Sequence, residues 1–248
     1  MTDHPGRVAW LGHATVVIEL DGVRLLTDPL LRRRTLHLHR IVPLPDEPLD
    51  GVDAVLISHA HWDHFDVASI RRLGRDVRVV VPRGVGILLA RKRFTNVTEV
   101  DEGDEVRVGA VVVRATYAEH RADRGPLGIR SASLGYVVAG DRSVYFAGDT
   151  DLFDGMHTLA TGLDVALLPV AGWGSKLPPG HMGPEAAAEA AARLQPQVAI
   201  PIHWATFAPF HRKTVHDPDA GEAFARSVHE KAPSVEVRVL RVGEACAI

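Results

Sequence analysis

The stretch SHAHWDHFD, residues 58–66, places three histidines and two aspartates within nine positions, directly after an apolar run. Alternate residues of a strand lie on one face, so His59 and His61 can bind one ion together. The chain must then turn, which allows Asp63 and His64 to face a second ion. Imidazole and carboxylate ligands together suit zinc, iron or manganese. A polar loop with surface histidines is the alternative, but this spacing behind an apolar strand favours a metal site.

Three further polar residues follow apolar runs elsewhere in the chain. His120 ends TYAEH, Asp149 follows VYFAG, and His203 follows VAIPI. Binding sites of α/β proteins form at the carboxyl ends of their strands, so these residues are expected to meet. Each one alone could be a strand-end residue that faces water. Together with the 58–66 stretch, they supply enough ligands for two ions.

The composition predicts an ordinary soluble globular protein. Hydrophobic residues make up 46% and charged residues 24% of 248 residues, with a net charge of −3. This charge gives no basic field for nucleic acid, which is therefore not expected as a partner. No apolar segment is long enough to span a membrane. A single cysteine, Cys246, excludes an internal disulfide, and together with the absence of a signal peptide it favours the cytoplasm.

The order of predicted elements favours two sheets packed together with helices outside, in a single domain over residues 1–248. No linker, repeat or low-complexity tract divides the chain. Apolar runs and turn residues predict strands over 8–20, 23–27, 53–58, 77–81, 134–139, 143–147, 163–170, 198–202 and 235–242, and a strand-rich stretch over 106–117 that is broken at Gly109-Ala110. Helical spacing and end signals predict helices over 67–73, 84–93, 184–194 and 220–231, and residues 30–48 are expected to be irregular.

These motifs together resemble those of the metallo-β-lactamase superfamily, over nearly the whole chain. The resemblance implies an α/β fold, a four-layer αβ/βα sandwich with a dinuclear site at one edge. It implies a first metal held by His59, His61 and His120, a second metal held by Asp63, His64 and His203, and a bridge between them at Asp149.

Within the superfamily, WLGHAT (10–15), LLTDP (25–29) and GHMGPEAA (180–187) resemble one branch. That branch contains ascorbate-6-phosphate lactonase and N-acyl phosphatidylethanolamine phospholipase D. The phospholipase pattern has tryptophan after its third-motif histidine, whereas Arg121 stands here, which argues against phospholipid cleavage. True β-lactamases usually lack the bridging aspartate, so Asp149 argues against antibiotic hydrolysis.

The predicted function is that of a dinuclear metal-dependent hydrolase with two divalent ions, zinc first, with manganese or iron as alternatives. Two ions about 3.5–4 Å apart can share a water molecule and lower its pKa towards 7. Attack by the metal-bound hydroxide is expected to cleave a phosphodiester or a lactone in a small phosphorylated substrate, with Asp63 in a catalytic as well as a ligand role. The alternative is a metal-holding binding or sensing module without hydrolytic turnover. A homo-oligomer is left open.

Two groups of residues are predicted to contact the substrate. Arg33 and Arg40, in the basic stretch 31–40, are predicted to bind its phosphate, although a solvated surface loop is the alternative. His181 lies just ahead of a predicted helix and is not needed for the metal shells. It is predicted to face the leaving group as a hydrogen-bond donor or general acid. Its alternative is a loop histidine that packs against Trp173 or caps backbone.

Two residues are predicted to support the ligands from behind. His13 follows an apolar run in WLGHAT and is expected to orient either a metal ligand or Asp28. A satisfied core histidine is the alternative for His13.

Overall fold

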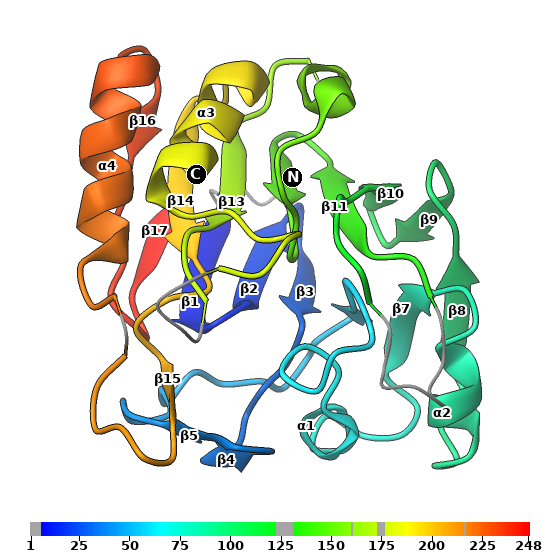
Figure 1. Ribbon diagram of the computed structural model, residues 1–248. Helices are drawn as coiled ribbons and strands as arrows, with labels where there is room; N and C mark the ends of the chain where they lie inside the picture. Colours follow the sequence, from blue (N-terminus) through cyan, green and yellow to red (C-terminus); the bar gives the residue numbers. More distant parts are fainter. Residues whose placement is uncertain (1–5, 123–130, 160, 173–176, 216) are drawn as a thin grey trace.

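Two seven-stranded sheets pack face to face in the computed structural model, which describes residues 6–122, 131–159, 161–172, 177–215 and 217–248 (Figure 1). The first sheet has the order β17-β1-β2-β3-β6-β7-β8. Its strands are β1 (Arg7–Gly12), β2 (Thr15–Leu20), β3 (Val23–Thr27), β6 (Ala54–Leu56), β7 (Arg78–Pro82), β8 (Val97–Val100) and β17 (Ala245–Ala247).

The second sheet has the order β16-β14-β13-β12-β11-β10-β9. Its strands are β9 (Glu105–Val108), β10 (Val111–Tyr117), β11 (Leu134–Ala139), β12 (Ser143–Phe146), β13 (Val165–Pro169), β14 (Val198–Ile202) and β16 (Glu236–Val237). A small third sheet contains β4 (Arg34–Thr35), β5 (Leu38–Arg40) and β15 (Phe207–Pro209). Both large sheets are mixed: antiparallel neighbours come first along the chain, and parallel neighbours follow, except that the last strand, β17, pairs antiparallel with β1.

Alternation along the strands divides the apolar side chains between two faces. Val8 and Trp10 belong to the large cluster that the two sheets share, whereas Ala9 and Leu11 belong to a smaller cluster on the opposite face. Successive side chains of a strand point to opposite faces, so an apolar strand that is buried on both faces needs cover on both.

Helices cover the outer faces of both sheets. On the first sheet, Ile70 of α1 (Val67–Arg71) and Leu89 of α2 (Gly86–Ala90) pack with Val55 and Val79. On the second sheet, α3 (Pro184–Leu194) contacts β13, and α4 (Ala220–Lys231) contacts β14. A short 3-10 helix, η1 (Asp154–Thr158), contacts α3. The helix, sheet, sheet and helix layers confirm the predicted α/β sandwich.

The helix end signals act as expected. Pro184 occupies the first turn of α3, and Gln195 ends it in a left-handed conformation with a φ of 48°. The Asp66 side chain accepts a hydrogen bond from the backbone N–H of Ser69 and caps α1. Because Asp66 caps a helix directly after the histidine-rich stretch, that stretch is held between a strand and a helix.

Two strand predictions and one prediction of irregular structure are wrong, and three strands were not predicted. Residues 8–20 form two strands, because His13 has a φ of 55° and turns the chain between them. Of 235–242, only Glu236–Val237 is a strand. Strands β4 and β5 lie within 30–48, which was expected to be irregular, and β8, β15 and β17 were not predicted. Among the described residues, no helix is both long and apolar enough to cross a membrane.

Candidate metal centre

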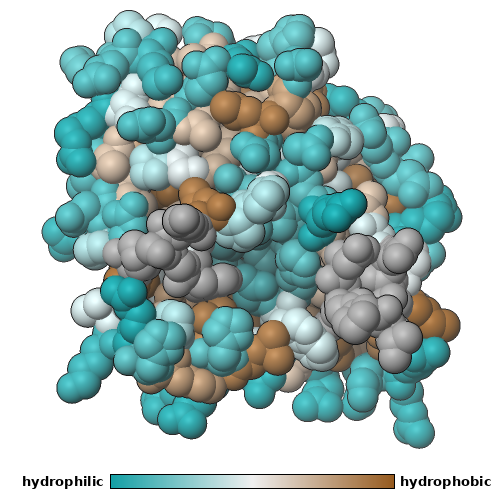
Figure 2. Space-filling view, in the orientation of Figure 1, coloured by the Kyte–Doolittle hydropathy of each residue, from teal (hydrophilic) through white to brown (hydrophobic). Residues whose placement is uncertain are grey.

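The 58–66 stretch leaves β6 and turns tightly, which brings alternate side chains to one place. The backbone N–H groups of His64 and Phe65 both donate to the His61 carbonyl, at 3.1 and 2.8 Å. The Ser58 carbonyl accepts from the Leu134 N–H of the second sheet at 2.9 Å. The turn is therefore anchored to both sheets. Figure 2 shows a hollow with hydrophilic side chains near the middle of the face that Figure 1 presents.

Three histidines form the first cluster. The Nε2 atom of His59 lies 3.0 Å from Nδ1 of His61, and Nε2 of His120 lies 3.1 Å from that same Nδ1. Zinc bonds imidazole nitrogen at about 2.0–2.1 Å, so tetrahedral ligand nitrogens lie roughly 3.3 Å apart. The observed separations fit that geometry closely.

A second cluster lies beside the first. The Nε2 atoms of His64 and His203 are 3.3 Å apart, and an Asp63 oxygen lies 3.6 Å from Nε2 of His64. His13 contributes its Nε2 atom, 3.2 Å from the same Asp63 oxygen. One ion can be reached by all four side chains, since their ligand atoms lie within 4.8 Å of one another.

Asp149 lies between the two clusters. Its Oδ2 atom is 3.9 Å from Nε2 of His59 and 3.1 Å from Nε2 of His64, and its Oδ1 atom is 3.2 Å from Nε2 of His203. The carboxylate is buried, and it contacts histidines of both clusters. Asp149 thus lies where the resemblance placed a bridging ligand.

The hydrogen bonds on the far side of the rings test whether a cation fits. Nδ1 of His120 donates to the Gly180 carbonyl, and Nδ1 of His203 donates to the Ala171 carbonyl, both at 2.8 Å. A carbonyl only accepts, so in each neutral ring the Nε2 atom carries a bare lone pair. The Nε2 atom of His120 faces Nδ1 of His61, and the Nε2 atom of His203 faces Nε2 of His64 and the Asp149 carboxylate. A cation between them removes the repulsion, so the residues fit a bound metal.

Burial keeps most of these rings neutral, which metal binding requires. It lowers the pKa of His59 well below the ordinary value and lowers the pKa of His120 to about 4. His64 differs: burial lowers its pKa, but the Asp149 and Asp63 carboxylates outweigh burial and raise it. Burial raises the pKa of Asp149, but His203 and His64 outweigh it and hold that pKa well below the ordinary value. Asp149 is therefore ionised.

Asp28 is linked by hydrogen bonds to one predicted ligand of each cluster, on the side of the ring that faces away from the candidate site. It accepts from Nδ1 of His64 at 2.7 Å and from the Ser58 hydroxyl at 2.5 Å. The Ser58 hydroxyl oxygen in turn lies 2.9 Å from Nδ1 of His59. Sequence reasoning placed Asp28 behind a ligand but missed Ser58, whose only signal is its position between the apolar run and His59.

His181 also reaches this centre. Its Nε2 atom lies 3.3 Å from Asp149 Oδ2, its Nδ1 atom lies 3.2 Å from the Pro178 carbonyl, and its ring centroid is 4.7 Å from that of His120. Burial lowers the pKa of His181, but the hydrogen bond to Asp149 outweighs it and raises that pKa. Contact with backbone, one part of the alternative, is therefore present, whereas Trp173 lies outside the described residues.

His13 contacts a ligand instead of Asp28. Besides the Asp63 contact, its ring centroid lies 4.0 Å from that of His203. Burial and the neighbouring His203 lower its pKa to about 3, so the ring is neutral. His13 could join the second cluster as a further ligand, which the sequence did not suggest.

Arg33 and Arg40 lie together but away from the clusters. They line a surface cavity of about 900 Å³ that also includes His39 and Phe210 and none of the seven predicted ligands. Arg40 donates to the Leu11 carbonyl at 3.0 Å, and burial lowers its pKa to about 10. Their assignment to the substrate stays a prediction.

The exposure of the side chains shows which side of the candidate centre faces solvent. His59, His64, Asp149 and His203 are buried, whereas His61, Asp63, His120 and His181 are partly exposed. A substrate can therefore approach over the partly exposed group. The arrangement therefore offers a metal two adjacent donor clusters, one of three imidazoles and one of imidazoles with a carboxylate. The Asp149 carboxylate lies between them.

The comparisons with known proteins agree with this fold and with a metal-dependent hydrolase. A family model described as "Beta-lactamase superfamily domain" matches residues 23–204. A UPF0173 metal-dependent hydrolase of Methanopyrus kandleri is 35% identical over 246 residues, which cover 96% of this chain and 98% of the relative. A second one, from Caldivirga maquilingensis, is 30% identical and covers 96% of each chain. Igni18, a metallo hydrolase from Ignicoccus hospitalis, superposes with a TM-score of 0.75 at 25% identity, covering 99% of both chains.

Two mixed sheets between helices, with histidines and aspartates gathered at the ends of their strands, define the metallo-β-lactamase class of metalloproteins. Within this superfamily, the chain belongs to the UPF0173 family of metal-dependent hydrolases.

Proposed function

We propose that the chain is a dinuclear hydrolase that binds two divalent ions, preferably zinc, and cleaves a phosphodiester or lactone bond in a small phosphorylated substrate. One observation carries the proposal: Asp149 lies between two clusters whose ring nitrogens face one another. The first ion would be held by His59, His61 and His120, and the second by Asp63, His64 and His203, with Asp149 shared.

The bound ions would supply a Lewis acid and a water molecule of lowered pKa. The chain's own residues would do the rest. Asp63 is partly exposed and ionised, since His64 outweighs burial and holds its pKa well below the ordinary value. It would accept a proton from the attacking water. His181, at the open side, would hold a proton at Nε2 and donate it to the leaving group.

The substrate class is proposed from three sequence motifs and two arginines. The motifs around His13, Asp28 and His181 resemble the branch that contains a phosphorylated-lactone hydrolase and a phosphodiesterase. Arg33 and Arg40 would bind a remote phosphate only if the substrate extends from the metal centre to their cavity. Replacement of both by glutamine would then raise KM for phosphorylated substrates and leave neutral esters unchanged.

Metal content tests the dinuclear site first. Protein purified without chelator is expected to contain two ions per chain by elemental analysis. Asp149→Ala should lose one ion and most turnover, because it removes the shared ligand. A wild-type content of one ion with full activity would exclude the dinuclear mechanism.

Turnover is tested separately. The metal-loaded protein is incubated with chromogenic phosphodiester, lactone, thioester and β-lactam compounds. Hydrolysis of the phosphodiester or the lactone supports the proposal if it is reduced in His181→Ala with both ions retained. Asp63→Asn should lose turnover and weaken binding of the second ion, because Asp63 is also a predicted ligand. Two bound ions with no turnover of any compound would instead favour a metal-holding binding or sensing module.

A further inference from the structure

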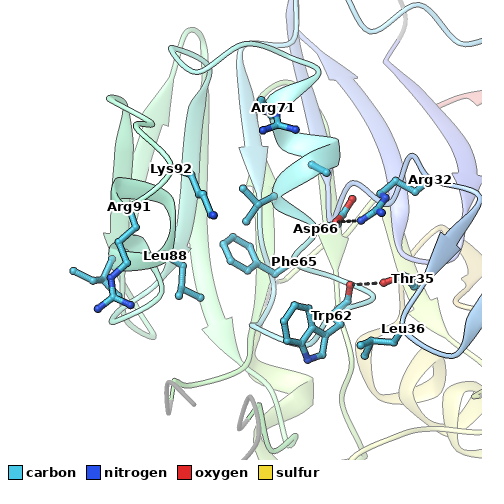
Figure 3. Close-up of a pocket in the computed structure, with 13 residues that line it drawn as sticks. Arg32, Thr35, Leu36, Trp62, Phe65, Asp66, Arg71, Leu88, Arg91 and Lys92 are labelled. Atoms are coloured by element: carbon cyan, nitrogen blue, oxygen red, sulfur yellow. Dashed lines mark hydrogen bonds and ion pairs between the residues drawn. The ribbon is translucent and has the colours of Figure 1, made fainter. Parts of the chain in front are cut away.

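A groove of about 910 Å³ lies beside residues 58–66, the metal loop, between that loop, α1, α2 and the segment that contains β4 (Figure 3). Three large apolar side chains line it while exposed to solvent: Leu36 (60%), Trp62 (50%) and Ile87 (50%). They are three of the five exposed large apolar side chains among the described residues. Such a concentration of exposed apolar surface marks a binding site more often than it occurs by chance.

Cations surround this apolar surface. The lining includes Arg32, Arg71, Arg91 and Lys92. Asp66 is the one carboxylate in the described lining, and it is already engaged. It pairs with Arg32 at 3.2 Å and accepts from the Ser69 hydroxyl at 2.6 Å. The groove is therefore positive in a chain whose net charge is −3, and it complements an anion.

We propose that this groove binds a small amphiphilic anion, meaning an apolar chain or ring that carries a phosphate or carboxylate group. The apolar part would lie against Trp62, Leu36 and Ile87, and the anionic group would lie near Arg91 and Lys92. The volume is that of a small-molecule site, about 300–1,000 Å³, and the groove is concave, which favours one bound molecule over a flat docking surface.

The groove is also connected to the metal loop. Trp62 stands between the predicted ligands His61 and Asp63, and its carbonyl accepts a hydrogen bond from the Thr35 hydroxyl at 3.3 Å. A molecule in the groove therefore contacts the loop from the side that carries Trp62. This binding site does not depend on the proposed hydrolysis, and its test needs no turnover.

Decyl phosphate, kept below the concentration at which it forms micelles, is the probe. Calorimetric titration of the metal-loaded protein should give one molecule bound per chain, with a blue shift of tryptophan fluorescence. Trp62→Phe should abolish most of the shift but keep calorimetric binding. Decanol, which lacks the charge, should bind at least tenfold more weakly, because it offers Arg91 and Lys92 no anionic group to pair with.

Matched charge variants test whether Arg91 and Lys92 bind the anionic group. Arg91→Gln with Lys92→Gln should weaken decyl phosphate binding roughly five- to tenfold, since each partly exposed ion pair contributes up to about a factor of five. Arg107→Gln with Arg226→Gln makes the same charge change at exposed positions outside the groove and should leave binding unchanged. Ile87→Glu, also at an exposed position, should abolish binding while retaining the circular dichroism of the wild type.

Three outcomes would overturn the proposal. Equal weakening in both charge variants would mean a diffuse electrostatic effect. Binding only to vesicles that contain phosphatidylserine, with no saturable binding of decyl phosphate, would mean a membrane-docking surface. Tighter binding of an acidic peptide than of decyl phosphate, lost in Ile87→Glu, would mean a protein-docking groove.

Discussion

Asp28 fixes one histidine of each cluster, directly or through a single hydroxyl. It accepts from His64, and it orients Ser58, whose oxygen lies next to His59. Groups behind the ligands set ring orientation and tautomer, and their loss typically lowers metal affinity about 10–100-fold. One buried carboxylate therefore controls the ligand geometry of both predicted metal sites.

Asp28→Asn should lower the affinity for both ions by about 10–100-fold while the fold is retained. The amide cannot accept as strongly as the carboxylate from both partners. Ser58→Ala is the matched variant, because it removes the contact to His59 and leaves that between Asp28 and His64. It should weaken only the first ion. Chelator competition with a chromophoric indicator measures both affinities, and equal behaviour of the two variants would contradict the assignment.

The ion pairs of Glu47 with Arg7 and Arg24 are expected to stabilise the fold in a pH-dependent way. It bonds Arg7 through both oxygens at 2.9 Å and Arg24 at 2.7 Å. The hydrogen bond from Arg7 lowers the pKa of Glu47 below its ordinary value. A lowered folded-state pKa stabilises the fold above the ordinary carboxyl pKa, and this contribution is lost as the pH falls through the folded-state value.

Glu47→Gln should therefore lower the free energy of unfolding by about 1 kcal/mol at pH 7 and by almost nothing near pH 3. Urea unfolding at a series of pH values measures the difference. Glu102→Gln, on an exposed turn, serves as the control and should change little at any pH. A difference between Glu47→Gln and the wild type that stays constant with pH would exclude this ionic contribution.

At the scale of elements, the ends of strands from different sheets meet with almost no space between them. Gly148, just before Asp149, has a φ of +61°, and a Cβ there would lie 2.6 Å from the Ser58 Cβ. The end of β12 can therefore approach the start of the metal loop only because residue 148 has no side chain.

Gly148→Ala should consequently displace Asp149 or the loop and lower both metal content and activity at least tenfold. Gly162→Ala is the control. Its φ of +69° gives similar backbone strain, but a Cβ there meets nothing within 4 Å. Elemental analysis and thermal unfolding of both variants separate the two effects. Equal metal loss in both variants would mean that backbone strain alone, and not contact with Ser58, causes the loss.

The long elements were predictable from sequence because their signals are local. Helices α3 and α4 match the predicted ranges, and Gln195–Pro196 ends α3 as expected. β17 is only three residues long and is formed by pairing with β1, far away in the chain, so no local pattern marks it. The break at His13 was missed because apolar residues continue on both sides of it.

The composition of the site was easier to predict than its connections. The ligand types and their positions after strands are visible in the sequence, and the structure brings all seven together. The contact of Ser58 with Asp28 depends on β3 lying next to β6, which no local signal determines. The groove beside Trp62 was missed for the same reason, since three distant segments line it.

At the scale of the whole molecule, the candidate metal centre lies where the two sheets meet. The predicted ligands within 58–64 follow β6 of the first sheet, whereas His120, Asp149 and His203 follow β10, β12 and β14 of the second. Ions held by both groups bind only the folded arrangement, so they stabilise it against unfolding.

Removal of both ions should therefore lower the melting temperature by roughly 10–20 °C. Occupancy at about 100 times Kd contributes ~2.7 kcal/mol per site, and each kcal/mol shifts the melting temperature of a chain of this size by about 2–4 °C. Differential scanning calorimetry with and without chelator measures the shift. Re-addition of zinc should restore it, and Asp149→Ala should respond less. An unchanged melting temperature after complete metal removal would contradict a shared site between the sheets.

The distribution of the ligands also sets an order of events during synthesis. His203 follows His59 by about 140 residues, so a ribosome adding about 5–20 residues per second completes the set roughly 7–30 s after the first ligand is made. Throughout that interval, the 58–64 segment carries metal-binding side chains without their partners and binds an ion only weakly. We therefore expect metal loading to be a late step, which takes place only after His203 has been made and depends on the ions that the cell then makes available.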